Sequence, residues 1–384
     1  MSNNNYLSLA GLFFVQSFSR GILLSIIPLQ TLALTGDVQR TSTLLFAVSA
    51  GGILAALVTP VLIQRIGPYP MFLFGCAMMF ISAVLLASHN LVYFSAGLFF
   101  HVFSIAASEV TLTLYVLAKV PRRKLTQFEP WRVLCTVLAL CIGPFLGVYF
   151  QKTFFHQLPF FVCAVFVFLS IVYFRSLGLH EVTIPRSGSQ IVNPLRYLAR
   201  YFHQPRLNLA YALVLARSSW WTMFVIYTPI YAERSGMGEL MGAALVSIGT
   251  AWTLSVPFWG WVGRRYGIRY LLQSGFFVTG VLSTLVYLNA ESPVVASVLL
   301  VVSALGATML DGVGNVLFYR AVRTRERSEM TAVFVTYRDF GQLATPGLYS
   351  ILLAFLTLPV VFSSAAVWMF IAGYFCRFIP RRMR

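Results

Sequence analysis

Gln64-Arg65-Ile66-Gly67-Pro68-Tyr69 lies between two long apolar runs of this chain, and so does Arg264-Arg265-Tyr266-Gly267-Ile268-Arg269, 200 residues later. At this offset Arg65 and Gly67 match Arg265 and Gly267. Pro28 and Pro229, near the end of the first apolar run of each half, repeat almost in step. The sequence therefore indicates an internal duplication of a unit that contains six apolar runs.

The composition predicts an all-α polytopic membrane protein. Apolar residues make up 58% of the 384, and charged residues make up 10%. A water-soluble domain needs far more charge to cover its surface. Twelve apolar runs of about 20 residues can each cross a bilayer as a helix, at about 6–33, 41–63, 71–89, 91–118, 133–150, 158–178, 207–231, 240–262, 270–288, 293–319, 330–356 and 360–379. The runs are continuously apolar, whereas the strands of a membrane barrel alternate, so a barrel is excluded.

These features resemble the major facilitator superfamily of secondary transporters. The loop between its spans two and three, and again between eight and nine, runs Gly-x-x-x-Asp-Arg-x-Gly-Arg-(Arg/Lys). The second copy here follows this pattern without the Asp, whereas the first has Pro60 for the leading Gly and Gln64 at the acidic position. The resemblance implies twelve transmembrane helices in two pseudo-symmetric six-helix bundles, 1–178 and 207–384, joined by a cytoplasmic linker, 179–206. It also implies a cytoplasmic gate, for which we expect Arg65, Gly67, Arg264, Arg265, Gly267 and Arg269.

The distribution of basic residues predicts the orientation. If the N-terminus is inside, 22 of the 28 lysines and arginines lie in cytoplasmic segments and three lie outside. This bias predicts a multi-pass protein of the cell membrane, with a bacterial inner membrane expected and with both termini cytoplasmic. The net charge of +17 then indicates anionic lipid of the cytoplasmic leaflet as a partner, not nucleic acid. We expect a monomer.

The linker contains a candidate amphipathic helix. Asn193 can cap it and Pro194 can begin it. Leu198 and Phe202 share one face with Leu195, while Arg196 and Arg200 share another, so we expect an interfacial helix with its arginines toward lipid phosphates. A solvated linker is the alternative.

Gly143-Pro144-Phe145-Leu146-Gly147 in the fifth span resembles the Gly-Pro-x-x-Gly core of a pattern found in proton-antiporting members of the superfamily. The resemblance supports antiport through Gly143, Pro144 and Gly147. The alternative is that this segment only kinks the helix and allows it to pack closely against a neighbour.

Charges inside spans are the main chemical signal, because a charge in hydrocarbon costs a few kcal/mol or more. Six lie well inside the predicted spans, roughly 13 to 21 Å from a membrane surface at ~1.5 Å per residue: Arg20, Glu109, Arg217, Asp311, Arg338 and Asp339. In the resembling fold, spans one, four, seven and ten line the central cavity, and these hold Arg20, Glu109, Arg217 and Asp311. We expect Glu109 and Asp311 to couple transport to protons, with rocking of the halves changing their distance from an arginine. At equal depth on consecutive helices, Asp311 and Arg338 are expected to form a bridge, with Arg338 and Asp339 as an intramembrane pair. The alternative is that these charges only stabilise the bundle.

Further cavity candidates lie on the fourth and seventh spans. His101 shares a polar stripe with Ser104 and Ser108, and it is a candidate proton relay or a histidine satisfied by a neighbour. Trp220, Trp221 and Tyr227 could line an apolar pocket or pack toward the bilayer. The five cysteines show no paired spacing, so neither a disulfide framework nor a metal cluster is expected.

Three functional classes fit this pattern to different degrees. The first is a secondary active transporter for a small organic solute, amphipathic or anionic, with export slightly favoured. No phosphate-binding Gly-x-x-x-x-Gly-Lys-Ser/Thr motif occurs, so no nucleotide cofactor is expected and coupling would use an ion gradient. The alternatives are a non-transporting sensor or assembly factor on the same fold and a membrane-embedded lipid-modifying enzyme. Scattered histidines argue against the enzyme.

Overall fold

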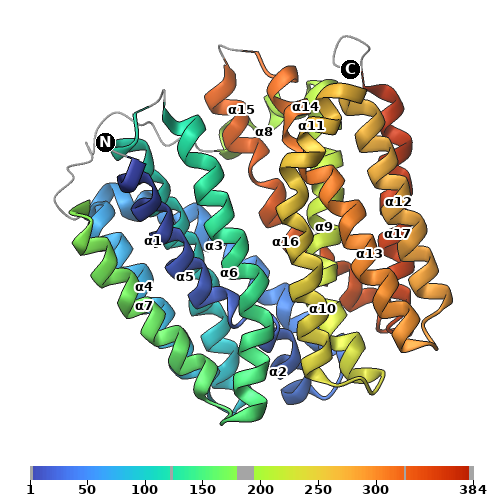
Figure 1. Cartoon of the computed structure of the whole chain (residues 1–384), viewed down its shortest axis with the longest axis horizontal. Coiled ribbons are helices and arrows are strands. Elements are labelled where there is room, and N and C mark those ends of the chain that lie inside the picture. Colours follow the sequence, from blue (N-terminus) through green and yellow to red (C-terminus); the bar gives the residue numbers. More distant parts are fainter. Residues whose placement is uncertain (1–2, 122–123, 180–193, 324–325, 380–384) are drawn as a thin grey trace. The chain divides into compact units, whose positions relative to one another are not determined.

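The computed structural model describes residues 3–121, 124–179, 194–323 and 326–379, and within these ranges every regular element is a helix (Figure 1). The chain divides into two compact units. Unit 1 contains Met1–Asp37 and Ala47–Gln190, and unit 2 contains Val38–Phe46 and Ile191–Arg384. The sequence-based division at 178 and 207 stays a prediction.

Unit 1 is built from seven helices in the described residues: α1 (Asn3–Gly21), α2 (Ile26–Thr35), most of α3 (Val38–Ile66), α4 (Pro68–Leu86), α5 (Leu91–Lys119), α6 (Leu125–Thr153) and α7 (Leu158–Ser176). Within it, α4 packs along α5, and α1 packs along α6 and α7. The first nine residues of α3, Val38–Phe46, group with unit 2.

Unit 2 contains α8 (Pro194–Phe202), α9 (Pro205–Arg234), α10 (Glu239–Ala251), η3 (Trp252–Ser255), α11 (Val256–Tyr266), α12 (Ile268–Leu288), α13 (Pro293–Asp311), α14 (Gly314–Ala321), α15 (Arg327–Phe334), α16 (Tyr337–Leu352), α17 (Val360–Phe375) and η5 (Cys376–Phe378). Here α12 packs along α13 and α17, and α9 packs against α10, α13, α14, α16 and α17. Helix α9 is therefore the central element of unit 2.

Eleven helical spans in the described part of the chain are long and apolar enough to cross a membrane. They match eleven of the twelve predicted runs. The remaining run, 330–356, is divided into α15 and α16 by a break at Val335 and Thr336, so neither piece reaches full span length alone. Together the pieces supply the twelfth passage of the predicted fold.

Three further spans are interrupted within runs that are continuously apolar in the sequence, and the eighth span narrows to η3 between α10 and α11. The first span breaks between Gly21 and Ile26, and the tenth breaks after Asp311. The breaks in the first and tenth spans lie close to an intramembrane charge, because Arg20 lies one residue before the end of α1 and Asp311 is the last residue of α13. Broken helices are typical of binding sites in transporters.

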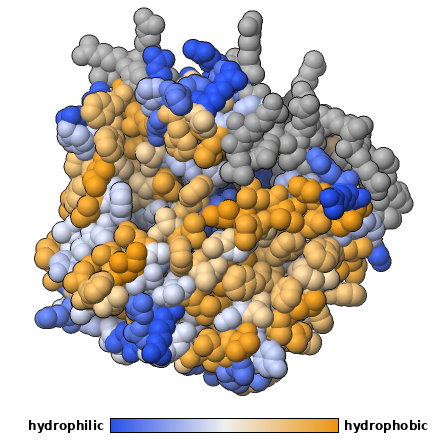
Figure 2. Space-filling view, turned by 180° about the vertical axis from the view of Figure 1, so that it is seen from behind, coloured by the Kyte–Doolittle hydropathy of each residue, from blue (hydrophilic) through white to orange (hydrophobic). Residues whose placement is uncertain are grey.

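Apolar side chains on the surface mark the lipid-facing sides of the helices (Figure 2). On α7, Phe161, Phe168 and Val172 are 65%, 63% and 48% exposed. Their spacing of seven and four residues places them on one helix face. An exposed stripe of this kind is stable only against hydrocarbon, which agrees with the membrane assignment.

The internal duplication is also present in the backbone. Gly67, between α3 and α4, and Gly267, between α11 and α12, have φ values of 93° and 98°. Each N–H donates to the carbonyl four residues earlier, at 2.9 and 3.1 Å. Gly36 and Gly236, also 200 residues apart, have φ values of 73° and 81°. Such φ values strongly favour glycine, so each unit requires a glycine at the same two turns.

The linker helix α8 begins at Pro194, as predicted. Asn193, its expected cap, lies outside the described residues. α8 packs against α15 and α9, and its Tyr201 is fully buried with the hydroxyl donating to the Leu207 carbonyl at 3.1 Å. The helix is thus anchored to unit 2 by at least one face.

Candidate functional site

An intramembrane ion pair in unit 1 joins Arg20 on α1 to Glu109 on α5. The two side chains are 21% and 43% exposed, respectively. Glu109 lies about 15 Å along α5 from Lys119, so the pair lies deep in the span. A charged pair with this exposure is stable at such depth only against water or polar groups, not lipid tails.

The break beside Arg20 is shaped by α6. A Cβ atom on Gly143 would lie 2.4 Å from the Gly21 carbonyl carbon, and one on Gly147 would lie 1.9 Å from the Ile22 carbonyl oxygen. The backbones of the first and fifth spans therefore touch, as small residues allow in membranes. Helix α6 continues through Pro144 to Thr153. These contacts give Gly143 and Gly147 a packing role, and a role of this motif in antiport stays a prediction.

His101, the candidate proton relay, is 6% exposed on α5, and its Nδ1 atom has no hydrogen-bond partner in the described structure. Arg20 is close enough to interact with the ring electrostatically. Ser104, on the same stripe, donates to the Gly75 carbonyl at 2.7 Å and so joins α5 to α4. The proton-relay function of His101 stays a prediction.

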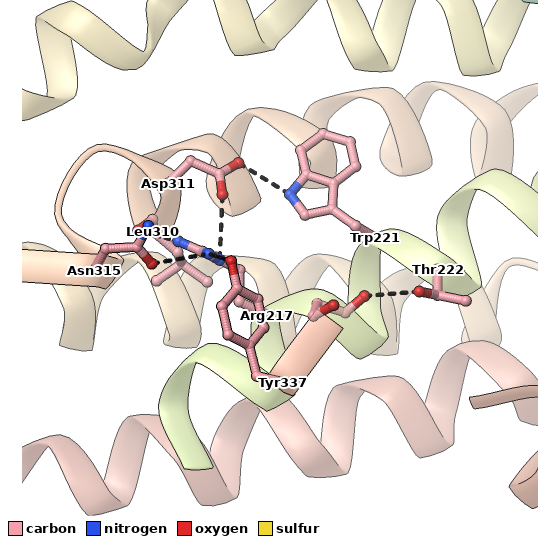
Figure 3. A network of polar contacts seen from close by, with 8 residues as sticks. Arg217, Trp221, Thr222, Leu310, Asp311, Asn315 and Tyr337 are labelled. Carbon is pink, nitrogen blue, oxygen red and sulfur yellow. Dashed lines mark hydrogen bonds and ion pairs between the residues drawn. The ribbon is translucent and has the colours of Figure 1, made fainter. Parts of the chain in front are cut away.

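Unit 2 contains a second cluster, centred on Arg217 (Figure 3). The Arg217 side chain on α9 is 8% exposed, and its Nε lies 3.2 Å from Asp311 Oδ1 at the end of α13. Its terminal nitrogens approach the Leu310 carbonyl at 3.5 Å, the Asn315 side-chain oxygen at 3.5 Å and the Tyr337 hydroxyl at 3.3 Å. The guanidinium therefore joins α9 to α13, α14 and α16 around the break in the tenth span.

Asp311 has a second partner. Trp221, one turn after Arg217 on α9, donates its indole N–H to Asp311 Oδ2 at 3.0 Å. Both carboxylate oxygens are thus engaged by α9, one by a cation and one by a neutral donor (Figure 3). The expected bridge from Asp311 to Arg338 is wrong, because depth along a helix does not determine the direction of a side chain, and Asp311 turns toward α9.

The two ion pairs repeat each other. Each joins the first span of its half to the fourth, Arg20 to Glu109 and Arg217 to Asp311. Arg217 follows Arg20 by 197 positions, and Asp311 follows Glu109 by 202, close to the offset of 200 in the loops. All four residues were candidates from the sequence. The pairing between them could have been found by superposing the two halves.

The other aromatic candidates lie in the interior of unit 2. Trp220 is 1% exposed and donates to the Ser283 hydroxyl on α12 at 3.1 Å. Tyr227 is fully buried, 2.7 Å from the Ser42 hydroxyl at the start of α3, and packs edge-to-face on Tyr349. Their expected place in a substrate cavity stays a prediction. Arg338 is exposed and Asp339 partly buried in the first turn of α16, and each has further polar or electrostatic interactions.

The predicted gate residues lie at two matching turns. Arg65, Arg264 and Arg265 are exposed, and the Arg265 guanidinium lies 5.4 Å from the centre of the Trp261 ring. Arg269, partly buried, begins α12 with Ile268. A gate that locks the halves stays a prediction.

Glu326, just before α15, connects the linker helix α8 to the rest of unit 2. Its carboxylate accepts from Gln204 at 3.2 Å and pairs with Arg200 on α8. These donors, with Gln204 first, hold the pKa of Glu326 below its usual range. The expectation that the α8 arginines turn toward lipid phosphates therefore does not describe Arg200, because a nearer carboxylate is available.

The described residues contain no group of three or more His, Cys, Asp or Glu side chains that could hold a metal ion. The charged groups deep in the described spans include the two acid–base pairs, Arg20–Glu109 and Arg217–Asp311. Such groups can exchange protons and bind polar parts of a solute.

Comparisons with known proteins agree with this architecture. Residues 9–346 match the family model of the Major Facilitator Superfamily. The peptide transporter POT in complex with sulfate superposes with a TM-score of 0.77 at 14% identity, over 99% of this chain and 94% of that chain. A POT family transporter in complex with 5-aminolevulinic acid gives 0.76 at 14% identity, over 99% and 96%. The nucleoside transporter NupG gives 0.73 at 14% identity, over 98% and 99%. A comparison with curated protein sequences gave no match.

The fold and the family match define a multi-pass membrane protein with a transporter fold. The chain belongs to the major facilitator superfamily.

Proposed function

We propose that this protein is a proton-coupled secondary transporter that moves a small organic solute by alternating access, with export slightly favoured over import. The observation that supports this most is the repeated ion pair, Arg20–Glu109 in unit 1 and Arg217–Asp311 in unit 2. A carboxylate beside an arginine inside a membrane is a group that can take up and release a proton. Glu109 and Asp311 are the proposed coupling residues.

The location of the pairs changes the expected mechanism. Each pair lies within one unit. Rocking of the units as rigid bodies does not by itself change the distance between Arg20 and Glu109, or between Arg217 and Asp311. We therefore propose that coupling depends on which side of the membrane supplies water and solute to each pair, and that protonation of the acid releases the arginine inside its own unit.

The proposed solute is small and either amphipathic or anionic. Aromatic groups beside a charged pair, such as Trp221 and Tyr337 around Arg217, fit a molecule with an apolar body and a polar group. A dipeptide, a nucleoside and 5-aminolevulinic acid are first probes, because transporters of similar fold are described as peptide or nucleoside transporters or in complex with 5-aminolevulinic acid. Thermal-shift screening of the purified protein against these three compounds, organic anions and lipophilic cations would identify a compound that binds, and this compound then serves as the probe in transport assays.

The test uses Glu109→Gln and Asp311→Asn in liposomes with an imposed pH gradient. Each substitution should abolish accumulation of the probe driven by pH. Exchange of labelled for unlabelled probe should survive in at least one variant, because exchange needs no net proton movement. If both variants accumulate the probe with the pH dependence of the original protein, the carboxylates are structural and the proposal fails.

A non-transporting sensor on the same fold is the second candidate. It is favoured by the first loop, where Pro60 and Gln64 replace residues of the superfamily pattern. Ligand binding without flux in the same liposomes would support it against the transporter.

A further inference from the structure

Helix α9 presents two donors to one carboxylate. Arg217 and Trp221 are four residues apart, so they lie one turn apart on the same face of the helix. Arg217 Nε lies 3.2 Å from Asp311 Oδ1, and Trp221 Nε1 lies 3.0 Å from Oδ2. The carboxylate is thus held at both oxygens by side chains of the same helix (Figure 3).

The two donors differ chemically. An arginine stays charged at every accessible pH, whereas the indole N–H is a neutral group that can only donate. While Trp221 donates to it, Oδ2 is a poorer site for a proton, because a protonated carboxyl oxygen accepts a hydrogen bond more weakly than a carboxylate oxygen does. Proton uptake on Oδ2 therefore weakens the indole contact. A hydrogen bond to the charged form of an acid favours that form.

The orientation of the indole is fixed by its neighbours. Trp221 packs edge-to-face on Phe224, with ring centres 5.8 Å apart at 90°, and on Trp220, with centres 5.3 Å apart at 80°. Trp220 itself turns away from Asp311 and donates to Ser283 on α12. Phe at position 220 keeps an aromatic ring against Trp221 and removes the N–H that Trp220 donates to Ser283, so Trp220→Phe is a matched control.

We propose that Trp221 is a positioning residue for proton coupling, which holds Asp311 in its charged form and sets the pH at which this carboxylate takes up its proton. This inference rests on the proposed role of Asp311. It adds a residue to which the sequence assigned only a place in an apolar pocket.

The charges around Asp311 are few. Arg217, from α9, is the charged group in contact with it, and the hydroxyl of Tyr337, from α16, reaches Asp311 only through Arg217. Asn315 on α14 is neutral and contacts Arg217. Every polar contact of Asp311 in the described structure is with Arg217 or Trp221. Trp221 is therefore the neutral contact whose removal changes the carboxylate without changing the charge of the cluster.

The test compares the unmutated protein with Trp221→Phe, Trp220→Phe and Asp311→Asn by infrared difference spectroscopy during a pH titration in lipid. The carboxylic-acid band that is missing in Asp311→Asn reports the protonation of Asp311. In Trp221→Phe its midpoint should rise by about 1 pH unit, the shift that the loss of one hydrogen bond to a charged acceptor produces. In Trp220→Phe it should stay where it is in the unmutated protein. The pH profile of probe transport should shift in the same direction in Trp221→Phe alone.

The outcomes separate this inference from the proposed function. An unchanged midpoint in Trp221→Phe, or an equal shift in Trp220→Phe, overturns the role of Trp221 and leaves Asp311 as a coupling residue. If no band depends on Asp311, this acid does not titrate, and both proposals about it fail. If Trp221→Phe does not fold, ultraviolet resonance Raman spectra of the unmutated protein decide. The indole band that reports N–H hydrogen bonding should change with the same midpoint as the Asp311 band, and a pH-independent band overturns the inference.

Discussion

Removing the negative charge of Asp311 should destabilise the protein far more than removing that of Glu109. The Arg217 side chain is 8% exposed, and Asp311 is the anion in contact with it. In Asp311→Asn this guanidinium keeps neutral acceptors, Asn315 and Tyr337, but loses its counter-ion. Breaking one side of a buried ion pair costs about 3–5 kcal/mol.

Removing the negative charge of Glu109 in unit 1 should cost less stability. Glu109 is 43% exposed and Arg20 is 21% exposed, so solvent can replace much of the lost interaction in Glu109→Gln. Pairs with this exposure contribute about 1 kcal/mol or less. The expected difference between the two variants is therefore at least ~2 kcal/mol.

The assay is unfolding in mixed micelles titrated with SDS, with a double-mutant cycle. Arg217→Gln combined with Asp311→Asn removes both charges and should recover most of the stability that Asp311→Asn alone loses, because no uncompensated charge remains. If Asp311→Asn is as stable as Glu109→Gln, or if the double variant is no more stable than Asp311→Asn, the pair does not behave as a buried ion pair.

Three further outcomes are expected. Gly147→Ala should lower the midpoint of thermal unfolding by several degrees, since its Cβ would lie 1.9 Å from the Ile22 oxygen. Gly52→Ala is the control, because its Cβ would meet ordinary contacts from 3.6 Å. Equal unfolding midpoints of the two variants would contradict the close packing at Gly147. Because the pKa of Glu326 is lowered in the folded protein, its charged carboxylate stabilises the fold at neutral pH, and this contribution is lost as pH falls through the lowered pKa. The difference in stability between the unmutated protein and Glu326→Gln should therefore narrow from about pH 5 downward. A difference that widens would exclude the contact with Gln204 and Arg200. Cysteines at positions 40 and 186 should label from outside and inside the cell respectively, and labelling of both from one side would refute the predicted orientation.

The sequence was sufficient to predict the architecture because the signals are strong and local. The twelve apolar runs and the 200-residue repeat each require only counting along the chain. The orientation, which rests on the asymmetry of basic residues, stays a prediction. Gly36 and Gly236 carried the same repeat and were overlooked, although their left-handed backbone makes them as informative as Gly67 and Gly267.

Contacts between side chains were harder to predict, for a physical reason. Position along a helix gives depth, and depth suggested Arg338 as the partner of Asp311. The direction of Asp311 depends on the end of α13, where the helix breaks, and the two glycines that mark this break, Gly312 and Gly314, were overlooked in the sequence. Likewise, Trp220 and Trp221 look equivalent in sequence, but successive residues point about 100° apart on a helix, so one packs on α12 and the other holds Asp311.

The repeated pair allows each unit to contain charges deep in its spans without joining it to the other unit. Because each pair is closed within its own unit, each unit carries no net charge from its pair, and neither pair has to break between the units in the alternating access that we propose. In the proposed mechanism, the energetic cost of the cycle then falls on events inside a unit, namely proton uptake by Glu109 or Asp311 and the release of its arginine. The units differ in exposure, because Glu109 is 43% exposed and Asp311 is 22% exposed. Asp311 also accepts from the neutral donor Trp221, so we expect Trp221→Phe to change the pH dependence of accumulation through Asp311.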